Sequence, residues 1–431
     1  MKHAIFLRRQ LLASGLAAFG LLTSGFFMTG AYRGQAPLVL LESSERIFRE
    51  VGWVRSAVAS RGDCSLYIVV DGRSSVVCYG EGRDFSGEIP AFSPSPDALA
   101  VDARGQIYVA DTEADRIVIV SPFGRLIRMF HAPRPLSLAV LSDGHIVVAS
   151  PMEGALLHLY DPSGRKLKSF GALKLFDGVS QAQNRFLNRG RVLVDAADNI
   201  YYVFEFSPNP TVQKFSREGE LLSEFAVEGQ AVDLQVQMAR RFLAEKSPRR
   251  VGGIVTVTSA VIDPMRGRLW IGTNGSSRSG VVYEYSLDGE KLREYAFVLK
   301  PTRDVIVGVE EIAVRWPWIY VFTSAGAYRF RADRGSVSDF RVLLEEQGLC
   351  PMAQDWPPCR TNCNTPTPDD DQDCKAALQG QISPNVRVIG SSCTNSEAHC
   401  SASVTTCDPT NGNQVMHTTM LDCVVGGFLN D

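Results

Sequence analysis

The stretch Asp102-Ala-Arg-Gly-Gln-Ile-Tyr-Val-Ala-Asp111, followed by Arg116-Ile-Val-Ile-Val120, contains two short apolar runs separated by a few polar residues. Both runs are rich in β-branched residues and too short for helices, which favours strands. A third apolar run, Ala98–Asp102, comes directly before them, and a fourth, ending at Phe130, follows the turn Pro122-Phe-Gly-Arg125. The stretch therefore predicts four consecutive β-strands.

The same arrangement recurs along the chain. Six apolar runs begin with Ile or Leu, with starts 41, 39, 54, 69 and 50 residues apart: Leu66–Val70, Ile107–Asp111, Ile146–Ser150, Ile200–Phe204, Leu269–Thr273 and Ile319–Thr323. In four units an aromatic residue stands six positions after a turn glycine: Gly124 and Phe130, Gly164 and Phe170, Gly219 and Phe225, Gly289 and Tyr295. Glycine supplies the positive φ that tight hairpin turns need.

A strand of small and branched residues precedes these runs, as in Ser137–Leu141, Val192–Asp195, Ala260–Asp263 and Glu311–Arg315. Four strands in a unit of about 40 residues, repeated along the chain, are typical of a β-propeller. The sequence therefore predicts an all-β fold, a six-bladed β-propeller over residues 35–349.

The two ends of the predicted ring are its least regular parts. Blade one is assigned to Ser56–Ser60, Leu66–Val70 and Val76–Tyr79, and blade six is expected to end near Phe340–Leu344. A ring must be closed by one blade shared between the chain ends or by a close edge contact, and Pro37–Leu41 is the candidate for a closing strand.

Two insertions, Gly171–Gly190 and Val227–Thr258, interrupt the period before blades four and five. In the second, the spacing of apolar residues from Val232 to Leu243 predicts an amphipathic helix. We expect this helix to pack on the blade surface; binding of a partner is the alternative.

Cysteine and charge are both unevenly distributed. Cys64 and Cys78 flank the Asp71-Gly72 hairpin of blade one and are predicted to form a disulfide. The other eight lie in the last 82 residues, a density typical of disulfide-stapled modules: Cys350, Cys359, Cys363, Cys374, Cys393, Cys400, Cys407 and Cys423.

Residues 350–431 contain 3 Lys and Arg against 9 Asp and Glu, a net charge of −6. We therefore expect a small acidic module of unrecognised family, stapled by disulfides whose connectivity is open. Strands are expected at Asn385–Ile389, Ala402–Thr406 and Gln414–Thr418.

Residues 1–34 have the pattern of an export signal. A basic N-terminus precedes the uncharged stretch Gln10–Tyr32, as in secretory signals. Residues 11–31 are also long enough, as a helix, to span a bilayer. The segment is thus either a cleaved signal or an uncleaved membrane anchor. In both cases we expect the rest of the chain to be exported, to the periplasm or the extracellular space, where disulfides form.

The pattern Asp102–Asp111 with Arg116–Val120 resembles an NHL repeat, and the resemblance covers about residues 56–344. It implies a six-bladed propeller that acts mostly as a binding platform, while related six-bladed folds include lactonases, lyases and other hydrolases. The fold alone does not choose among these functions. We expect an exported binding or scaffold protein that recognises a protein, peptide or anionic ligand through one propeller face. A lactonase-like hydrolase or lyase and a structural component of a cell-envelope assembly are the alternatives.

No catalytic or metal-binding residues are predicted. Lactonases of the gluconolactonase type hold a divalent metal with Glu, Asn and Asp of the inner strands; here Glu311 lacks the matching set. Asp102, Asp195 and Asp263 end inner strands, and we interpret them as turn residues rather than a carboxylate ring. The 6 histidines have no metal-ligand spacing, and no Gly-x-Ser-x-Gly is present. We expect no cofactor and favour a non-enzymatic role.

Arg134, Arg189, Arg191 and Arg303 lie in or beside loops that lead into inner strands, and these loops share one propeller face. Four guanidinium groups on one face predict a site for a carboxylate or phosphate ligand, or for an acidic protein such as the chain's own tail. Ordinary solvated loop charge is the alternative. The formal net charge of −3 disfavours nucleic acid as a partner. We therefore expect a protein or peptide partner.

Overall fold

The structure is a computed structural model of the chain. It describes residues 36–43, 45–48, 52–60, 64–80, 87–90, 96–244, 251–274, 281–300, 306, 308–324, 326–337, 386–393, 400–407 and 414–419. The segment 1–34, Arg303 and Phe340–Leu344 lie outside the described residues.

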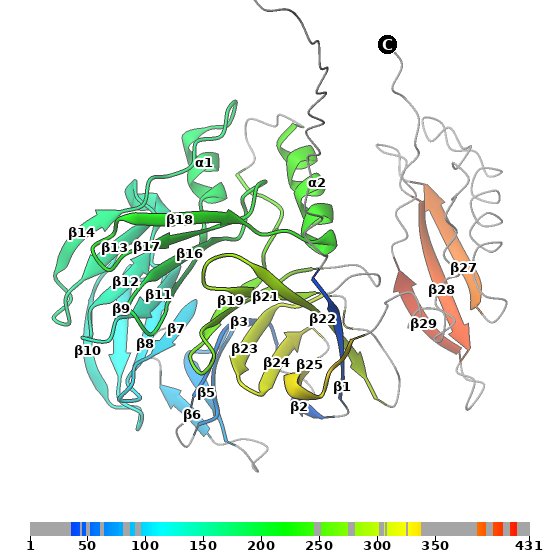
Figure 1. Cartoon of the computed structure of the whole chain (residues 1–431), viewed down its shortest axis with the longest axis horizontal. Helices are drawn as coiled ribbons and strands as arrows, with labels where there is room; N and C mark the ends of the chain where they lie inside the picture. Colours follow the sequence, from blue (N-terminus) through cyan, green and yellow to red (C-terminus); the bar gives the residue numbers. More distant parts are fainter. Residues whose placement is uncertain are drawn as a thin grey trace, which may run out of the picture. The chain divides into compact units, whose positions relative to one another are not determined.

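Residues 38–337 form six β-sheets, the blades of the propeller (Figure 1). Blade one contains β3 (Val54–Ala59), β4 (Leu66–Val70), β5 (Ser75–Tyr79) and β6 (Gly87–Pro90). Blade two contains β7 (Ala98–Val101), β8 (Ile107–Asp111), β9 (Arg116–Val120) and β10 (Leu126–His131). Blade three contains β11 (Ser137–Val140), β12 (Ile146–Ala149), β13 (Leu157–Tyr160) and β14 (Lys166–Phe170). Blade four contains β15 (Gly190–Val194), β16 (Ile200–Phe204), β17 (Thr211–Phe215) and β18 (Leu221–Ala226). Blade five contains β19 (Ser259–Asp263), β20 (Arg268–Gly272), β21 (Val282–Ser286) and β22 (Lys291–Leu299). Blade six contains β23 (Glu311–Arg315), β24 (Trp318–Thr323) and β25 (Gly326–Arg331).

The first strand of every blade lies innermost, and these six inner strands form a closed ring. Each of β3, β7, β11, β15 and β19 contacts the next inner strand, and β23 contacts β3. Buried apolar side chains fill the spaces between blades, as where Tyr67 and Val69 of blade one pack with Leu99 and Val109 of blade two. The predicted six-bladed propeller is confirmed.

The N-terminal segment closes the ring. β2 (Arg46–Phe48) pairs with β25 as the outermost strand of blade six. β1 (Leu38–Ser43) lies parallel to β22 on the outer edge of blade five, and β26 (Ser336–Val337) pairs with its other side. Val39 and Leu41 are buried in the cluster between blades five and six. The expected closing strand therefore exists, but it extends blade five, while Arg46–Phe48 completes blade six.

The contacts between blades explain the six-residue spacing between each turn glycine and the aromatic residue that follows it. The aromatic ring of an outer strand lies against the turn glycine of the next blade, where a Cβ atom would collide with it: Phe130 against Gly164, Phe170 against Gly219 and Phe225 against Gly289. The three glycines have φ between +80° and +91°. Glycine is thus required for two reasons, the backbone conformation and the close approach of the ring.

The two insertions form helices on one face of the propeller. α1 (Gln181–Leu187) precedes β15, and α2 (Gln230–Ala244) precedes β19. Both helices therefore lie on the face where the inner strands begin (Figure 1). Val232 of α2 is buried in the cluster between blades four and five, and Val236 packs against the same cluster, so the prediction that this helix packs on the blades is confirmed. Short 3₁₀ helices occur at η1 (Pro151–Glu153) and η2 (Ala332–Arg334). None of the helices in the described ranges is long and apolar enough to cross a membrane.

The C-terminal residues that the structure describes form a separate antiparallel sheet. It consists of β27 (Val386–Cys393), β28 (Cys400–Cys407) and β29 (Gln414–Thr419), with β28 in the middle. These strands overlap the three that the sequence predicts.

Replacement of Gly219 tests the ring-on-glycine contact, with Gly144 as the matched control. Both have similar φ, but a Cβ at Gly219 would lie 2.7 Å from the Phe170 ring, whereas at Gly144 it would lie 3.6 Å from Pro162. We expect Gly144→Ala to lower the free energy of unfolding by about 1 kcal/mol. Gly219→Ala should cost about 1–3 kcal/mol more, because the ring must move. Urea unfolding measures both, and equal losses would mean that the contact contributes nothing.

Candidate functional site

A cavity of about 840 Å³ lies at the centre of the ring and is lined by all six inner strands. The inner strand of each blade begins at one end of this cavity, and the second strand of the blade runs back and ends there. Charged side chains gather there, and we call this end the mouth. The charged residues that line it are Arg55, Asp71, Asp97, Arg189, Arg191, Glu205, Glu310 and Glu311. Towards the ends of the inner strands the lining is apolar: Val58, Val101, Val140, Val194 and Ile262.

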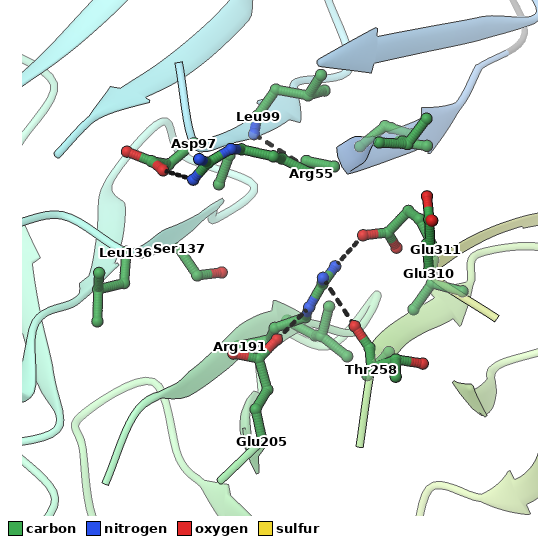
Figure 2. Close-up of a pocket in the computed structure, with 18 of the residues that line it drawn as sticks. Arg55, Asp97, Leu99, Leu136, Ser137, Arg191, Glu205, Thr258, Glu310 and Glu311 are labelled. Atoms are coloured by element: carbon green, nitrogen blue, oxygen red, sulfur yellow. Dashed lines mark hydrogen bonds and ion pairs between the residues drawn. The ribbon is translucent and has the colours of Figure 1, made fainter. Parts of the chain in front are cut away.

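Arg191, at the start of β15, binds two carboxylates from different blades (Figure 2). Its Nε lies 2.7 Å from Glu205 Oε1, and its Nη1 lies 2.5 Å from Glu311 Oε2. Nη2 donates to the carbonyl oxygen of Thr258 at 3.0 Å. The guanidinium thus joins blades four, five and six across the mouth. We call Arg191, Glu205 and Glu311 the triad.

Glu311 is fully engaged. Its side chain is 1% exposed, and Oε1 accepts hydrogen bonds from the Ser259 hydroxyl and the Ile312 backbone N–H. Burial raises the pKa of the Glu311 carboxyl to about 7, although Arg191 and Ser259 favour the charged form. Burial also opposes the charge on Arg191, but Glu311 and Glu205 outweigh it and raise the pKa of the guanidinium. Arg191 therefore stays charged, and Glu311 exchanges a proton near neutral pH.

A second set of ion pairs lies beside blades one and two. Arg55 Nη2 is 2.6 Å from Asp71 Oδ1. Arg55 Nη1 is 2.5 Å from Asp97 Oδ1 (Figure 2). Asp71 follows β4, and Asp97 precedes β7. These pairs are more exposed than the triad, so each stabilises the fold less, but together they fix the charged side chains of this side of the mouth.

The structure brings together two of the four arginines that the sequence singles out. Arg189 and Arg191 line the mouth. Arg189 lies over the rings of Phe186 and Phe206, 5.3 and 5.4 Å from their centroids. Arg134 is exposed, does not line the cavity, and donates its backbone N–H to Asp115. Arg303 lies outside the described residues, and binding of an anion by this group stays a prediction.

Sequence reasoning missed most of the residues at the mouth. Arg55, Asp97 and Glu310 stand at or just before the starts of inner strands, the same positional signal that selected the arginines. Glu311 has this position in blade six, but from the sequence we considered it only as a metal ligand. A search for both signs of charge at these positions would have found them.

Glu310 has no ion-pair partner among the described residues of the mouth. Burial raises the pKa of the Glu310 carboxyl, although the backbone N–H of Val54 donates a hydrogen bond to it. Its Oε2 is buried without a hydrogen-bond partner. Trp53, the residue before Val54, also lines the cavity and is 67% exposed.

The interpretation of the recurring aspartates as turn residues is confirmed. Asp102 Oδ1 accepts the backbone N–H groups of Arg104 and Gln106. Asp195 makes the same pair of bonds in its own turn, and Asp263 accepts the N–H of Met265. Across the residues with described side chains, no group of three or more His, Cys, Asp or Glu could hold a metal ion.

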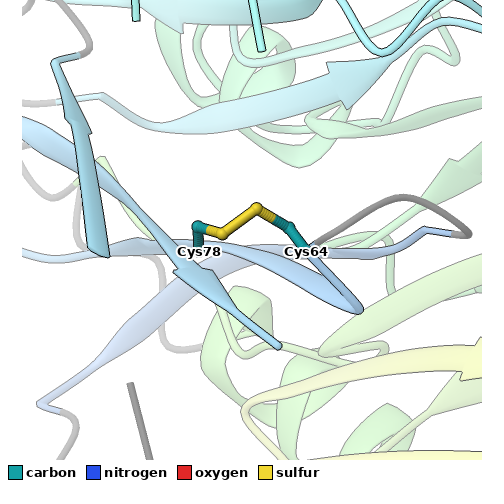
Figure 3. Close-up of a disulfide and its surroundings, with 2 residues drawn as sticks. All are labelled: Cys64 and Cys78. Carbon is teal, nitrogen blue, oxygen red and sulfur yellow. A yellow bond between two sulfur atoms is a disulfide. The ribbon is translucent and has the colours of Figure 1, made fainter. Parts of the chain in front are cut away.

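The predicted disulfide of blade one is present (Figure 3). Cys64 stands just before β4 and Cys78 within β5, with a Cα–Cα distance of 5.3 Å, and both are buried. Pairing of the eight C-terminal cysteines stays a prediction.

No protein-family model matches the chain, so membership of the NHL family stays a prediction. No curated protein matches it either. Similar solved structures include virginiamycin B lyase from Staphylococcus aureus, with 12% identity over 69% of this chain and 88% of that chain and a TM-score of 0.40. A streptogramin B lyase has 10% identity over 68% of this chain and 97% of that chain, with a TM-score of 0.45. A gluconolactonase from Xanthomonas campestris has 13% identity over 66% and 88%, also with a TM-score of 0.45. Likeness at this level says nothing about the chemistry of the mouth.

The triad predicts a pH-dependent stability. The pKa of Glu311 is about 7 in the folded chain, against 4.5 for an ordinary glutamate. The folded chain therefore retains a proton that the unfolded chain has lost, and the stabilisation present below pH 4.5 is lost as the pH rises to 7. The slope is up to about 1.4 kcal/mol per pH unit.

Urea unfolding between about pH 5 and 7.5 measures this slope. Glu311→Gln should reduce it, because the glutamine does not titrate, while Glu310, whose pKa burial also raises, leaves a smaller slope of the same sign. Glu220→Gln, at an exposed turn position, should keep the wild-type slope. A Glu311→Gln slope equal to that of the wild type would contradict the assignment.

Proposed function

We propose that the chain is an exported binding protein that captures a peptide segment of a partner at the mouth of its propeller. The observation that carries this function is the preformed central cavity of about 840 Å³, a volume within the range of ligand sites. The triad and the ion pairs of Arg55 hold its charged side chains in place within the chain itself. Preorganised groups lower the entropic cost of binding.

The hydrolase or lyase alternative has less support. Glu311 is the one inner-strand residue that matches the metal-binding glutamate of lactonases, and both of its carboxylate oxygens are engaged, with Arg191 on one side and with Ser259 and Ile312 on the other. A carboxylate already neutralised by a guanidinium is a poor ligand for a second cation.

Export is part of the proposal. The Cys64–Cys78 disulfide supports it, because structural disulfides persist in oxidising compartments. Residues 1–34 would serve as the export signal, or as an anchor through residues 11–31, and residues 350–431 would form a separate disulfide-stapled module.

Selection of peptides from a random library on the immobilised full chain tests the function. Leu136→Trp adds bulk at the mouth without removing an ion pair, since Leu136 lines the cavity. We expect selected peptides to bind this variant at least about 10-fold more weakly, a loss of roughly 1.4 kcal/mol, measured by fluorescence polarisation.

Leu222→Trp is the matched control, because Leu222 is 52% exposed on the outer strand β18. Its affinity should equal that of the wild type. Failure to enrich any peptide, or equal binding to both variants, would refute a binding function of the mouth.

A further inference from the structure

We infer that the captured peptide presents a lysine or arginine side chain at the mouth, where Glu310 and Trp53 bind it. This inference rests on the proposed function and adds the chemical class of the ligand. The arginines alone predict an anionic ligand. The ion pairs that the arginines form within the chain favour a cationic one instead.

The charge balance at the mouth is negative. Among the described lining residues, five carboxylates face three guanidinium groups, a difference of −2. Arg55 and Arg191 each bind two of the carboxylates. With Glu311 protonated, four carboxylates still face three guanidinium groups. Arg55 and Arg191 are thus already neutralised, while Arg189 has no carboxylate partner among the described residues and lies over Phe186 and Phe206. Because carboxylates remain in excess, an added cation would improve the charge balance of the mouth.

Glu310 is the carboxylate that remains for a ligand. It is half-buried directly before β23, and its Oε2 is buried without a hydrogen-bond partner. Burial without a compensating cation destabilises its charged form and raises its pKa. An ammonium or guanidinium group would satisfy the free oxygen with a charge-assisted hydrogen bond, which is roughly twice as strong as a neutral one.

Trp53 supplies an aromatic surface in the same sector of the mouth. The hydrogen bond from the Val54 N–H to Glu310 places the carboxylate beside the residue that follows Trp53. Tryptophan is the aromatic side chain that attracts cations best. The mouth already holds one cation in this way, since Arg189 lies over Phe186 and Phe206.

The apolar wall of the cavity favours a basic side chain over a bare cation. Inward from the charged residues the lining consists of small and branched apolar residues such as Ala57, Leu99 and Ala139. Lysine and arginine cover apolar surface with their methylene stems while the charged head binds a polar group.

Four blocked peptides of Gly and Ser, each fluorescein-labelled and with one central test residue, provide the probes. The test residues are arginine, lysine, citrulline and glutamate; citrulline is the uncharged isostere of arginine. We expect the full chain to bind the arginine and lysine peptides at least about 10-fold more tightly than the other two, by fluorescence polarisation.

Glu310→Gln should weaken binding of the arginine peptide about 10-fold and leave the citrulline peptide unchanged. The glutamine retains an acceptor for the Val54 N–H, so the fold is preserved. Glu113→Gln, an exposed glutamate between β8 and β9 that does not line the cavity, should leave both affinities unchanged. Trp53→Leu should cost the arginine peptide about 2- to 5-fold.

Equal binding of the arginine and citrulline peptides, or no effect of Glu310→Gln, would overturn the inference. The proposed function would survive that result if library peptides without basic residues still lost affinity for Leu136→Trp. If no peptide depends on Leu136, the function itself fails.

Discussion

The seating of an aromatic ring on the turn glycine of the next blade is the contact on which the arrangement of the propeller depends. The ring fits only where a Cβ is missing, so each such pair sets the position of one blade relative to its neighbour. Three consecutive interfaces use it, between blades two and five. Beyond them the chain relies on β1 and β2 to complete the circle. Once the ring is closed, the six inner strands all begin at the same end of the cavity, and this arrangement forms the mouth.

The triad is a consequence of that closure, because its members are distant in the sequence. Arg191 and Glu311 are separated by 120 positions and meet only when blades four and six face each other across the ring. Removing two charges from water is costly, and a buried pair offsets that cost only when its remaining polar atoms are also bonded. Here they are, through Thr258, Ser259 and the backbone of Ile312. Loss of Arg191 would leave the buried Glu311 without its cation, whereas Arg191 would still have Glu205 if Glu311 were lost. The triad thus holds the mouth in one geometry.

The sequence predicts the local elements of the fold better than the pairing of distant strands that closes the ring. The blades, the turn aspartates, the helix α2 and the Cys64–Cys78 bridge all follow from residues within about 40 positions of one another, where periodicity and turn chemistry are visible. Completion of blade six was not predictable in the same way. β2 has three residues and no apolar alternation. Its partner β25 is near the C-terminal end of the propeller sequence, about 280 positions later. Register between such strands is set by the closed ring and not by any local signal.

The mouth shows why residue type and position together do not determine what a site binds. Arg191 stands where the sequence places a ligand-binding arginine, yet its guanidinium is bonded to two carboxylates, so it leaves no positive charge for a ligand. The net charge that a ligand meets at the mouth is set by the side chains that remain unpaired within the protein. This pairing depends on which strands the fold brings together. Among the described lining residues, Glu310 and Arg189 remain outside these ion pairs, each with a buried side-chain atom, Oε2 and Nε, that has no hydrogen-bond partner, and the carboxylates outnumber the guanidinium groups. A buried acceptor without a donor is a cost to the free protein, and a ligand that removes this cost gains affinity from a defect that the fold itself creates.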